Sequence, residues 1–255
     1  MSSFTLSDKH RKLARSLHLR KHRDEEQLFI AEGEKVVVEL LRSSLSIEWI
    51  CVDEARMDSF PYIVHQAVVR SLPLFSCTSK VFASISETPS PQGVVAIARM
   101  EEPRPVLGDR VVALDGLQDP GNVGTIVRTA HFFAYDCVLL GTHSTDRYNG
   151  KFIRSCMGSC FHIPCVATDL RESLEELRST HTVVGADAHA RTSLHDCILP
   201  QKHCIVIGSE GSGISPAVER LLHERFVIAG GGGAESLNAS VAAGICLHHF
   251  AQRRS

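Results

Sequence analysis

Three segments after residue 118 combine glycine with polar side chains that could do chemistry. Residues 119–130, 205–214 and 235–244 each have the pattern of a strand end, a turn rich in Gly, Asn or Ser, and a helix start. Such turns of a parallel α/β domain meet at the carboxyl edge of its sheet, where ligands bind. We therefore expect the three segments to form one site.

Each segment offers a side chain suited to binding or catalysis. Arg128 stands in the helix after the first turn, where a guanidinium can hold a phosphate through two parallel hydrogen bonds. A single arginine of this kind is more often an ordinary exposed helix residue. Glu210 could equally serve a helix N-terminus, and Ser236 could be a helix N-cap. Asparagine is a poor helix former, so helix propensity does not explain why Asn238 stands at a helix start, and this favours a functional role.

Composition predicts a soluble globular protein. Hydrophobic residues make up 44% and charged residues 22% of the 255 positions. No apolar run approaches the roughly 18 residues that span a bilayer, and the N-terminus lacks the apolar core of a signal peptide. We expect a cytoplasmic protein without a membrane partner. The nine cysteines are scattered without a Cys-x-x-Cys pair, so buried thiols are expected and a metal site is not.

Charge is distributed unevenly along the chain. The net charge is −2, yet residues 1–24 hold seven Lys or Arg against two Asp. This asymmetry fits a polyanionic partner near the N-terminus, and it fits a solvated basic helix face equally well. The charges alone leave both interpretations open.

Two prolines in residues 101–105 mark a linker, because each removes a backbone donor and disfavours helix before it. We therefore expect domains at 1–105 and 106–255. In the first domain, helices are expected at 7–19, 32–44 and 61–69, and strands at 46–52, 74–77 and 93–98. In the second, strands are expected near 110–115, 137–141, 162–167, 181–187, 203–209 and 225–229. Helices are expected between them near 121–134, 151–158, 170–179, 215–224 and 236–252. This alternation predicts a parallel sheet covered on both faces.

The three segments resemble the three motifs of the SpoU (TrmH-like) RNA ribose methyltransferases of the SPOUT superfamily. The matching positions are Asn122, Gly124 and Arg128, then Gly208, Glu210 and Gly211, then Ser236, Leu237 and Asn238. Residues 151–158 are similar to the family segment between the first two motifs. The absence of Gly-x-Gly-x-x-Gly after the first strand disfavours the Rossmann-type methyltransferases.

The resemblance implies a fold and partners. It implies an α/β SPOUT trefoil-knot domain with a parallel sheet, preceded by a small α/β RNA-binding domain similar to a ribosomal-protein fold. The knot would form an S-adenosylmethionine pocket, and two subunits would pack across the knot helices as a homodimer. The chain departs from the family after Ile228, where relatives usually have Pro-Met and this chain has Ala229 and four glycines.

The resemblance also implies residue roles. The expected catalytic residues are Arg128, Asn122, Glu210, Asn238 and Ser236; the expected cofactor-binding residues are Gly208, Ile228 and Leu237. Arg20, Lys21 and Arg23 are expected to contact RNA phosphates. We prefer for Arg128 the role of holding a phosphate and stabilising a developing 2′-alkoxide.

The expected function is S-adenosylmethionine-dependent methylation of a ribose 2′-hydroxyl in structured RNA. Ribosomal RNA is the first expectation for the substrate and transfer RNA the second. Two alternatives stay open: a catalytically silent RNA-binding SPOUT protein, and a member of the base-modifying SPOUT branch.

Overall fold

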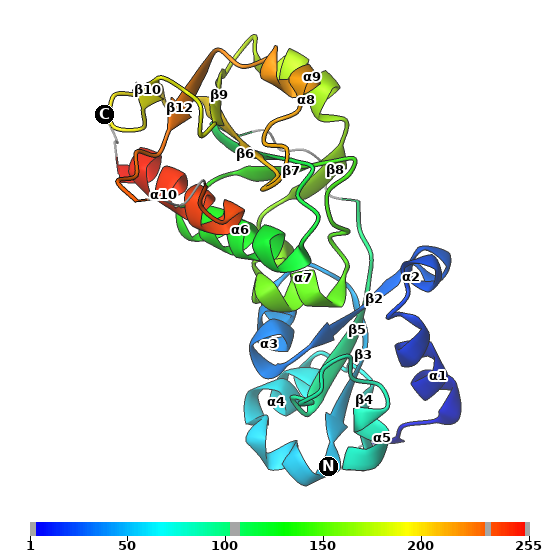
Figure 1. Ribbon diagram of the computed structural model, residues 1–255. Helices are drawn as coiled ribbons and strands as arrows, with labels where there is room; N and C mark the ends of the chain where they lie inside the picture. The colour runs from blue at the N-terminus through cyan, green and yellow to red at the C-terminus, as the bar shows by residue number, and fades with distance from the viewer. Residues whose placement is uncertain (1–3, 103–107, 233–235, 253–255) are drawn as a thin grey trace. The chain divides into compact units, whose positions relative to one another are not determined.

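The computed structural model describes residues 4–102, 108–232 and 236–252. Contacts divide the chain into two compact units (Figure 1). The first contains residues up to 102 together with 148–161, and the second contains residues 103–147 and 162–255. The sequence analysis placed 148–161 in the domain 106–255, whereas its contacts assign this segment to the first unit.

The first unit contains a five-stranded mixed sheet. Its order is β1-β4-β3-β5-β2, in which β5 is antiparallel to β2 and β3, while β4 is parallel to β1 and β3. The strands are β1 (Phe4–Thr5), β2 (Leu28–Glu32), β3 (Ile47–Asp53), β4 (Leu74–Cys77) and β5 (Val94–Arg99). β2 was not predicted, since its continuous apolar run lacks an alternating pattern. Its five residues are all buried.

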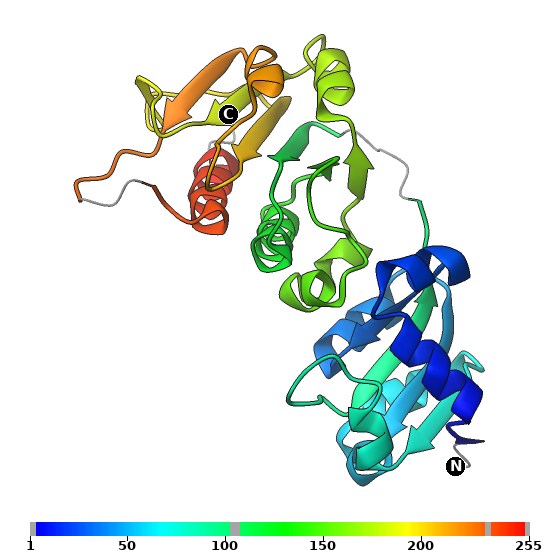
Figure 2. The same ribbon diagram turned by 45° about the vertical axis from the view of Figure 1, so that its right-hand side comes forward.

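Helices cover both faces of this sheet, with α1 on one side and α3 and α4 on the other (Figures 1 and 2). They are α1 (Asp8–Ser16), α2 (Arg20–Glu26), α3 (Glu34–Arg42), η1 (Glu54–Ser59), α4 (Pro61–Val69), α5 (Ser79–Ala83), α7 (Gly150–Ser155) and η2 (Ser159–Phe161). The helix predicted at 7–19 ends at Ser16, because residues 17–19 form a tight corner before α2. The helix predicted at 151–158 ends at Ser155, because Met157 and Gly158 adopt left-handed backbone with φ of 52° and 82°.

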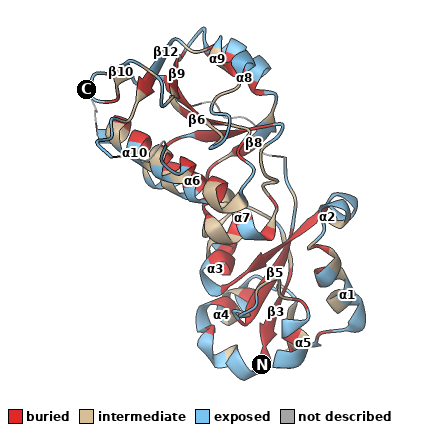
Figure 3. Ribbon diagram, in the orientation of Figure 1, coloured by how far each residue is buried: buried red, intermediate tan, exposed pale blue. Residues whose placement is uncertain are grey.

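The second unit contains a seven-stranded sheet of order β10-β12-β9-β11-β6-β7-β8. All neighbouring strands run parallel, which confirms the predicted sheet. The strands are β6 (Arg110–Asp115), β7 (Cys137–Gly141), β8 (Cys165–Thr168), β9 (Thr182–Ala186), β10 (Thr192–Ser193), β11 (His203–Gly208) and β12 (Glu224–Val227). The central strands β6, β7 and β11 are buried along nearly their whole length (Figure 3).

Four helices cover the two faces of this sheet. They are α6 (Pro120–Phe132), α8 (Leu170–Leu177), α9 (Pro216–Glu219) and α10 (Ala239–Gln252). α6 and α10 pack together on one face and α8 and α9 on the other (Figure 1). α9 is much shorter than the helix predicted at 215–224, because the chain turns at Leu221 and enters β12 at Glu224. The arrangement leaves the carboxyl ends of β6 and β11 beside the starts of α6 and α10.

Candidate active site

The ends of two adjacent parallel strands bring the first two motifs together. Gly208 at the end of β11 pairs in register with Asp115 at the end of β6. The Asp115 carboxylate also accepts a hydrogen bond from the backbone N–H of Ser215 at 2.7 Å, which ties the second motif's loop to the first strand. The predicted meeting of these turns at the carboxyl edge of the sheet is therefore confirmed.

The start of α6 places Asn122. Asp119 is the N-cap residue, and its Oδ1 accepts a hydrogen bond from the Asn122 backbone N–H at 2.9 Å. Pro120 is the first helical residue, where its missing N–H has no cost. The helix thus begins one residue before the predicted start at residue 121, and Asn122 lies in its first turn. The Asn122 side chain is left half-buried at the carboxyl edge of the sheet.

Glu210 links all three motifs through one oxygen atom. Its Oε1 accepts hydrogen bonds from Asn122 Nδ2 at 2.9 Å and from Asn238 Nδ2 at 2.7 Å. The backbone N–H of Ala239 donates to the same oxygen at 3.2 Å. Asn238 Nδ2 also donates to Asn122 Oδ1 at 3.1 Å. The three side chains form one hydrogen-bonded cluster, as the sequence predicted from positions far apart in the chain.

Asn238 is also the capping residue of α10. Its Oδ1 accepts from the Ser240 and Val241 backbone N–H groups at 3.0 and 3.3 Å, and from Ser240 Oγ at 2.6 Å. These donors fix the amide so that Nδ2 faces Glu210. The capping role considered for Ser236 is wrong, because α10 begins three residues later and Ser236 is exposed before it. The capping role therefore explains why an asparagine stands at the start of α10, which helix propensity alone did not explain.

Ser240 is a site residue that the sequence analysis missed. Its hydroxyl restrains Asn238, yet the motif pattern stopped at the Ser-Leu-Asn triplet. The signal was present, since a serine two residues after a capping asparagine is well placed for such a bond.

Arg128 lies apart from the Glu210 cluster. It is exposed on α6, six residues after Asn122 and therefore about 9 Å further along the helix axis. Within the described ranges, no side chain forms a hydrogen bond or ion pair with the Arg128 guanidinium. The guanidinium is therefore available for an anionic ligand.

Gly208 is the last residue of β11, whereas Ile228 and Leu237 lie in the loops that follow β12 and precede α10. A Cβ on Gly208 would come within 2.2 Å of the Gly213 carbonyl carbon, because residues 209–213 fold back through paired backbone hydrogen bonds. Ile228 is half-buried directly after β12, and Leu237 is 45% exposed directly before Asn238. A Cβ on Gly211 would meet nothing within 4 Å. The open backbone at Gly211 would allow a ligand to approach closely.

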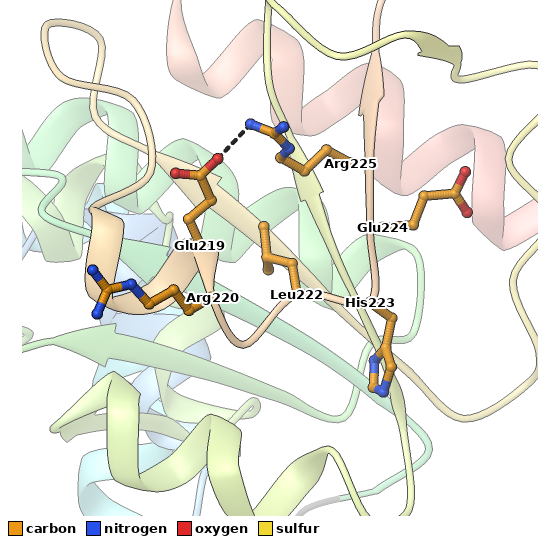
Figure 4. Close-up of a pocket in the computed structure, with 6 residues that line it drawn as sticks. All are labelled: Glu219, Arg220, Leu222, His223, Glu224 and Arg225. Carbon is orange, nitrogen blue, oxygen red and sulfur yellow. Dashed lines mark hydrogen bonds and ion pairs between the residues drawn. The ribbon is translucent and has the colours of Figure 1, made fainter.

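The hollow in Figure 4 is a separate feature. Its lining consists of Glu219, Arg220, Leu222, His223, Glu224 and Arg225. Arg225 forms an ion pair with Glu219, drawn in the figure, and another with Asp187 at 2.9 Å. These residues run from the end of α9 through the following turn to the start of β12, whereas the Glu210 cluster lies at the ends of β6 and β11. The hollow is not part of the candidate active site.

The three residues expected to contact RNA differ from one another. Arg20 and Lys21 are exposed on α2, but each faces an acidic residue four positions later, at 3.5 and 3.8 Å. Arg23 is buried, and its Nη1 donates to the carbonyl oxygens of Leu17 and His18 at 2.8 and 2.9 Å. Because it is buried, Arg23 is a structural residue of the α1–α2 corner, and the prediction that it contacts RNA phosphates is wrong.

Within the described residues, no group of three or more His, Cys, Asp or Glu side chains could hold a metal ion. Over the same part of the chain, no helix is both long enough and apolar enough to cross a bilayer.

Comparisons with known proteins show which family the chain is similar to. Residues 109–248 match the model of the SpoU rRNA Methylase family, and residues 9–96 match the MRM3-like substrate binding domain. The 23S rRNA (guanosine(2553)-2′-O)-methyltransferase RlmP of Bacillus subtilis (strain 168) is 32% identical, over 92% of this chain and 93% of the relative.

Two solved structures are similar over nearly the whole chain. A putative RNA methyltransferase of the TrmH family from Porphyromonas gingivalis has a TM-score of 0.86 and 32% identity, covering 98% of this chain and 99% of that one. An AdoMet-bound rRNA methyltransferase from Sinorhizobium meliloti has a TM-score of 0.85 and 27% identity, covering 99% and 97%.

The fold and the three-motif site define a methyltransferase of the SPOUT superfamily with an N-terminal substrate-binding domain. Within that class, the chain belongs to the SpoU rRNA Methylase family.

Proposed function

We propose that this protein transfers a methyl group from S-adenosylmethionine to a ribose 2′-hydroxyl of ribosomal RNA. The observation that carries the proposal is the Glu210 cluster, which joins one polar residue from each family motif through hydrogen bonds of 2.7–3.1 Å. Transfer RNA is the second candidate substrate. The relatives support both the class of reaction and the preference for ribosomal RNA, since one methylates 23S rRNA and another is an AdoMet-bound rRNA methyltransferase.

Gly208, Ile228 and Leu237 would hold the cofactor. S-adenosylmethionine supplies an electrophilic methyl group on a sulfonium. The residues of this chain then need only to position the ribose and to stabilise charge on its 2′-oxygen.

Arg128 has the chemistry to hold the RNA and stabilise the reacting oxygen. Its guanidinium stays charged at any working pH, so it is poorly suited to accept the hydroxyl proton. It can bind a phosphate beside the target ribose and stabilise the developing alkoxide electrostatically. Asn122 would orient the ribose through its amide.

Glu210 is proposed as the residue that orients the two asparagines. One of its carboxylate oxygens is already occupied by three donors, and these donors come from Asn122, Asn238 and the start of α10. Fixed first-turn side chains reduce the reorganisation needed at the moment of reaction. Ser236 lies exposed beside this cluster and completes the proposed catalytic set.

A homodimer across α6 and α10 is also proposed. These helices pack against each other, and they expose Phe132, Val241 and Ile245 by 81%, 50% and 39%. Large apolar side chains on adjacent helices favour burial against a partner. The domain roles are proposed as RNA binding for 1–105 and methyl transfer for 106–255. With ribosomal RNA as the substrate, the proposed location is the cytoplasm.

The test combines cofactor binding with methyl transfer. Calorimetry should detect S-adenosylmethionine binding, and label from its methyl group should enter ribosomal RNA faster than transfer RNA. Arg128→Ala should abolish transfer while cofactor binding and the melting temperature stay near those of the wild type. Arg128→Lys should also be poor, because a point charge cannot reproduce a bidentate contact. Absence of cofactor binding would favour the silent RNA-binding alternative, and normal transfer by Arg128→Ala would remove this arginine from the mechanism.

A further inference from the structure

The outward face of α1 carries basic side chains. Lys9, Lys12 and Arg15 are all exposed, while Ala14 and Leu17 on the opposite face are fully buried. The three basic residues are spaced three apart and therefore span about 9 Å along the helix axis. Side chains of this length on adjacent turns can reach successive phosphates of a nucleic acid strand.

Pairing separates these three residues from the rest of the basic N-terminal segment. Arg11 forms an ion pair with Asp8 at 3.0 Å, and Arg20 and Lys21 face Asp24 and Glu25. In the part of the chain that the structure describes, no ion pair involves Lys9, Lys12 or Arg15. α2 contains three basic and three acidic residues, so its net charge is zero. The uncompensated positive charge of the segment therefore lies on α1.

Several contacts anchor the two ends of α1. His18 Nε2 contacts the Ile85 carbonyl oxygen at 3.0 Å, just beyond α5. The buried Arg23 guanidinium binds the carbonyl oxygens of Leu17 and His18 at the end of α1. At the other end, the backbone N–H of His10 donates to the N-cap hydroxyl of Ser7. A preorganised helix loses little conformational freedom when its surface binds a partner.

We propose that the α1 face formed by Lys9, Lys12 and Arg15 binds the phosphate backbone of the RNA substrate, and that α2 contributes little. This inference rests on the proposed function, since it names the surface that grips the RNA. These three exposed cations are not in ion pairs within the described residues, and they are regularly spaced along the helix, as phosphates are along an RNA strand. Contacts of this kind position RNA without reading its sequence.

The test uses the full-length triple variant Lys9→Gln/Lys12→Gln/Arg15→Gln. Glutamine keeps an unbranched polar side chain and a similar helix propensity while removing the charge. RNA affinity is measured by fluorescence anisotropy from 50 to 200 mM salt, with a single-stranded ribosomal RNA fragment. Each lost phosphate contact lowers the slope of log affinity against log salt by about 0.7 to 0.9, so the triple variant should lose about 2 to 3 units of slope.

A matched comparison is the double variant Arg20→Gln/Lys21→Gln on α2. Its slope should change by less than about one unit, because both side chains are already compensated. The proposal would be overturned if the triple variant kept the wild-type slope of log affinity against log salt. It would also be overturned if the double variant lost as much slope per charge removed as the triple variant. The proposal would also be overturned if α1 bound anionic phospholipid vesicles while the triple variant kept the RNA affinity of the wild type.

The α1 surface and the proposed methyl-transfer function can be refuted independently of each other. The triple variant should bind S-adenosylmethionine with unchanged affinity. A wild-type protein that binds RNA with the expected salt slope but transfers no methyl group would contradict the proposed function and leave the α1 surface supported.

Discussion

Asn122 donates a hydrogen bond of 2.9 Å to Oε1 of Glu210, although 88 positions separate the two residues in the chain. The same oxygen accepts from Asn238 at 2.7 Å. One carboxylate therefore holds the first turn of α6 against the start of α10. Any loss of this oxygen should loosen two asparagines at once, and this property distinguishes Glu210 from an ordinary exposed acid.

Glu210→Gln should lower the rate of methyl transfer about 10- to 100-fold. Hydrogen bonds to a charged group contribute about 1.5–3 kcal/mol, and about 1.4 kcal/mol corresponds to a tenfold change in rate. The measurement is single-turnover methyl transfer, with melting temperature as a check on folding. Glu175→Gln is the matched control, because Glu175 is an exposed acid on α8 that lies 3.9 Å from Arg171. Wild-type rates in Glu210→Ala would refute the anchoring role.

Ser240→Ala should have a smaller effect on the same step. It removes one of three donors to Asn238 Oδ1, and the two backbone donors remain. One hydrogen bond contributes about 1 kcal/mol, so turnover should fall about fivefold while KM for S-adenosylmethionine stays nearly constant.

Rescue and coupling distinguish positioning by Ser240 from a general loss of stability. Ser240→Thr should restore turnover because it keeps the hydroxyl. The double variant with Glu210→Gln should lose less than the two single losses combined, since both act on Asn238. Strictly additive losses would show that Ser240 acts elsewhere.

Much of the site was predictable because its residues stand at strand ends in recognisable turns. Asn122, Glu210 and Asn238 were expected together, and the structure joins them directly. Local patterns could not tell which residue caps α10, because Ser236 and Asn238 are both good capping residues and tertiary contacts with Glu210 decide between them. Arg23 shows the same limit. Lys21 and Asp24 on the same helix are exposed, and only the fold of the α1–α2 corner buries Arg23.

The segment 148–161 was the least predictable part of the fold. It follows β7 in sequence, yet the Tyr148 hydroxyl donates to the Glu101 carbonyl oxygen at 2.7 Å and Phe29 packs on the Tyr148 ring. A residue near the end of α7, Arg154, lies 3.0 Å from Glu87 and 4.0 Å from the buried Glu32. Such long-range pairings leave no periodic signal in the sequence.

Arg154→Met should therefore destabilise the protein by about 1–3 kcal/mol. The Glu32 side chain is only 2% exposed, and removing the nearby cation leaves two carboxylates close together. Unfolding in urea measures the change. Arg42→Met is the control, since the Arg42–Glu39 pair is more exposed and should contribute less than about 1 kcal/mol. Equal losses in the two variants would contradict a special role for the Arg154 contacts.

Stability should fall as the pH drops below about 6.5. Burial lowers the pKa of His203, and the nearby charges of Arg110 and His181 act in the same direction. Between the lowered pKa and the ordinary value of about 6.5, the unfolded chain binds a proton that folded His203 does not. The stabilisation is therefore complete above pH 6.5 and declines below it. Melting temperatures from pH 7.5 to 5.5 should show a shallower decline in His203→Gln, and parallel curves would exclude His203 as the cause.

Nucleoside analysis shows directly whether this protein methylates a ribose 2′-hydroxyl. The purified protein is incubated with unmodified ribosomal RNA and S-adenosylmethionine carrying a deuterated methyl group, and the RNA is digested to nucleosides for mass spectrometry. We expect a single deuterated 2′-O-methylnucleoside, absent when Arg128→Ala replaces the wild type. A deuterated methyl group on a base, or none on any nucleoside despite cofactor binding, would contradict the proposed function.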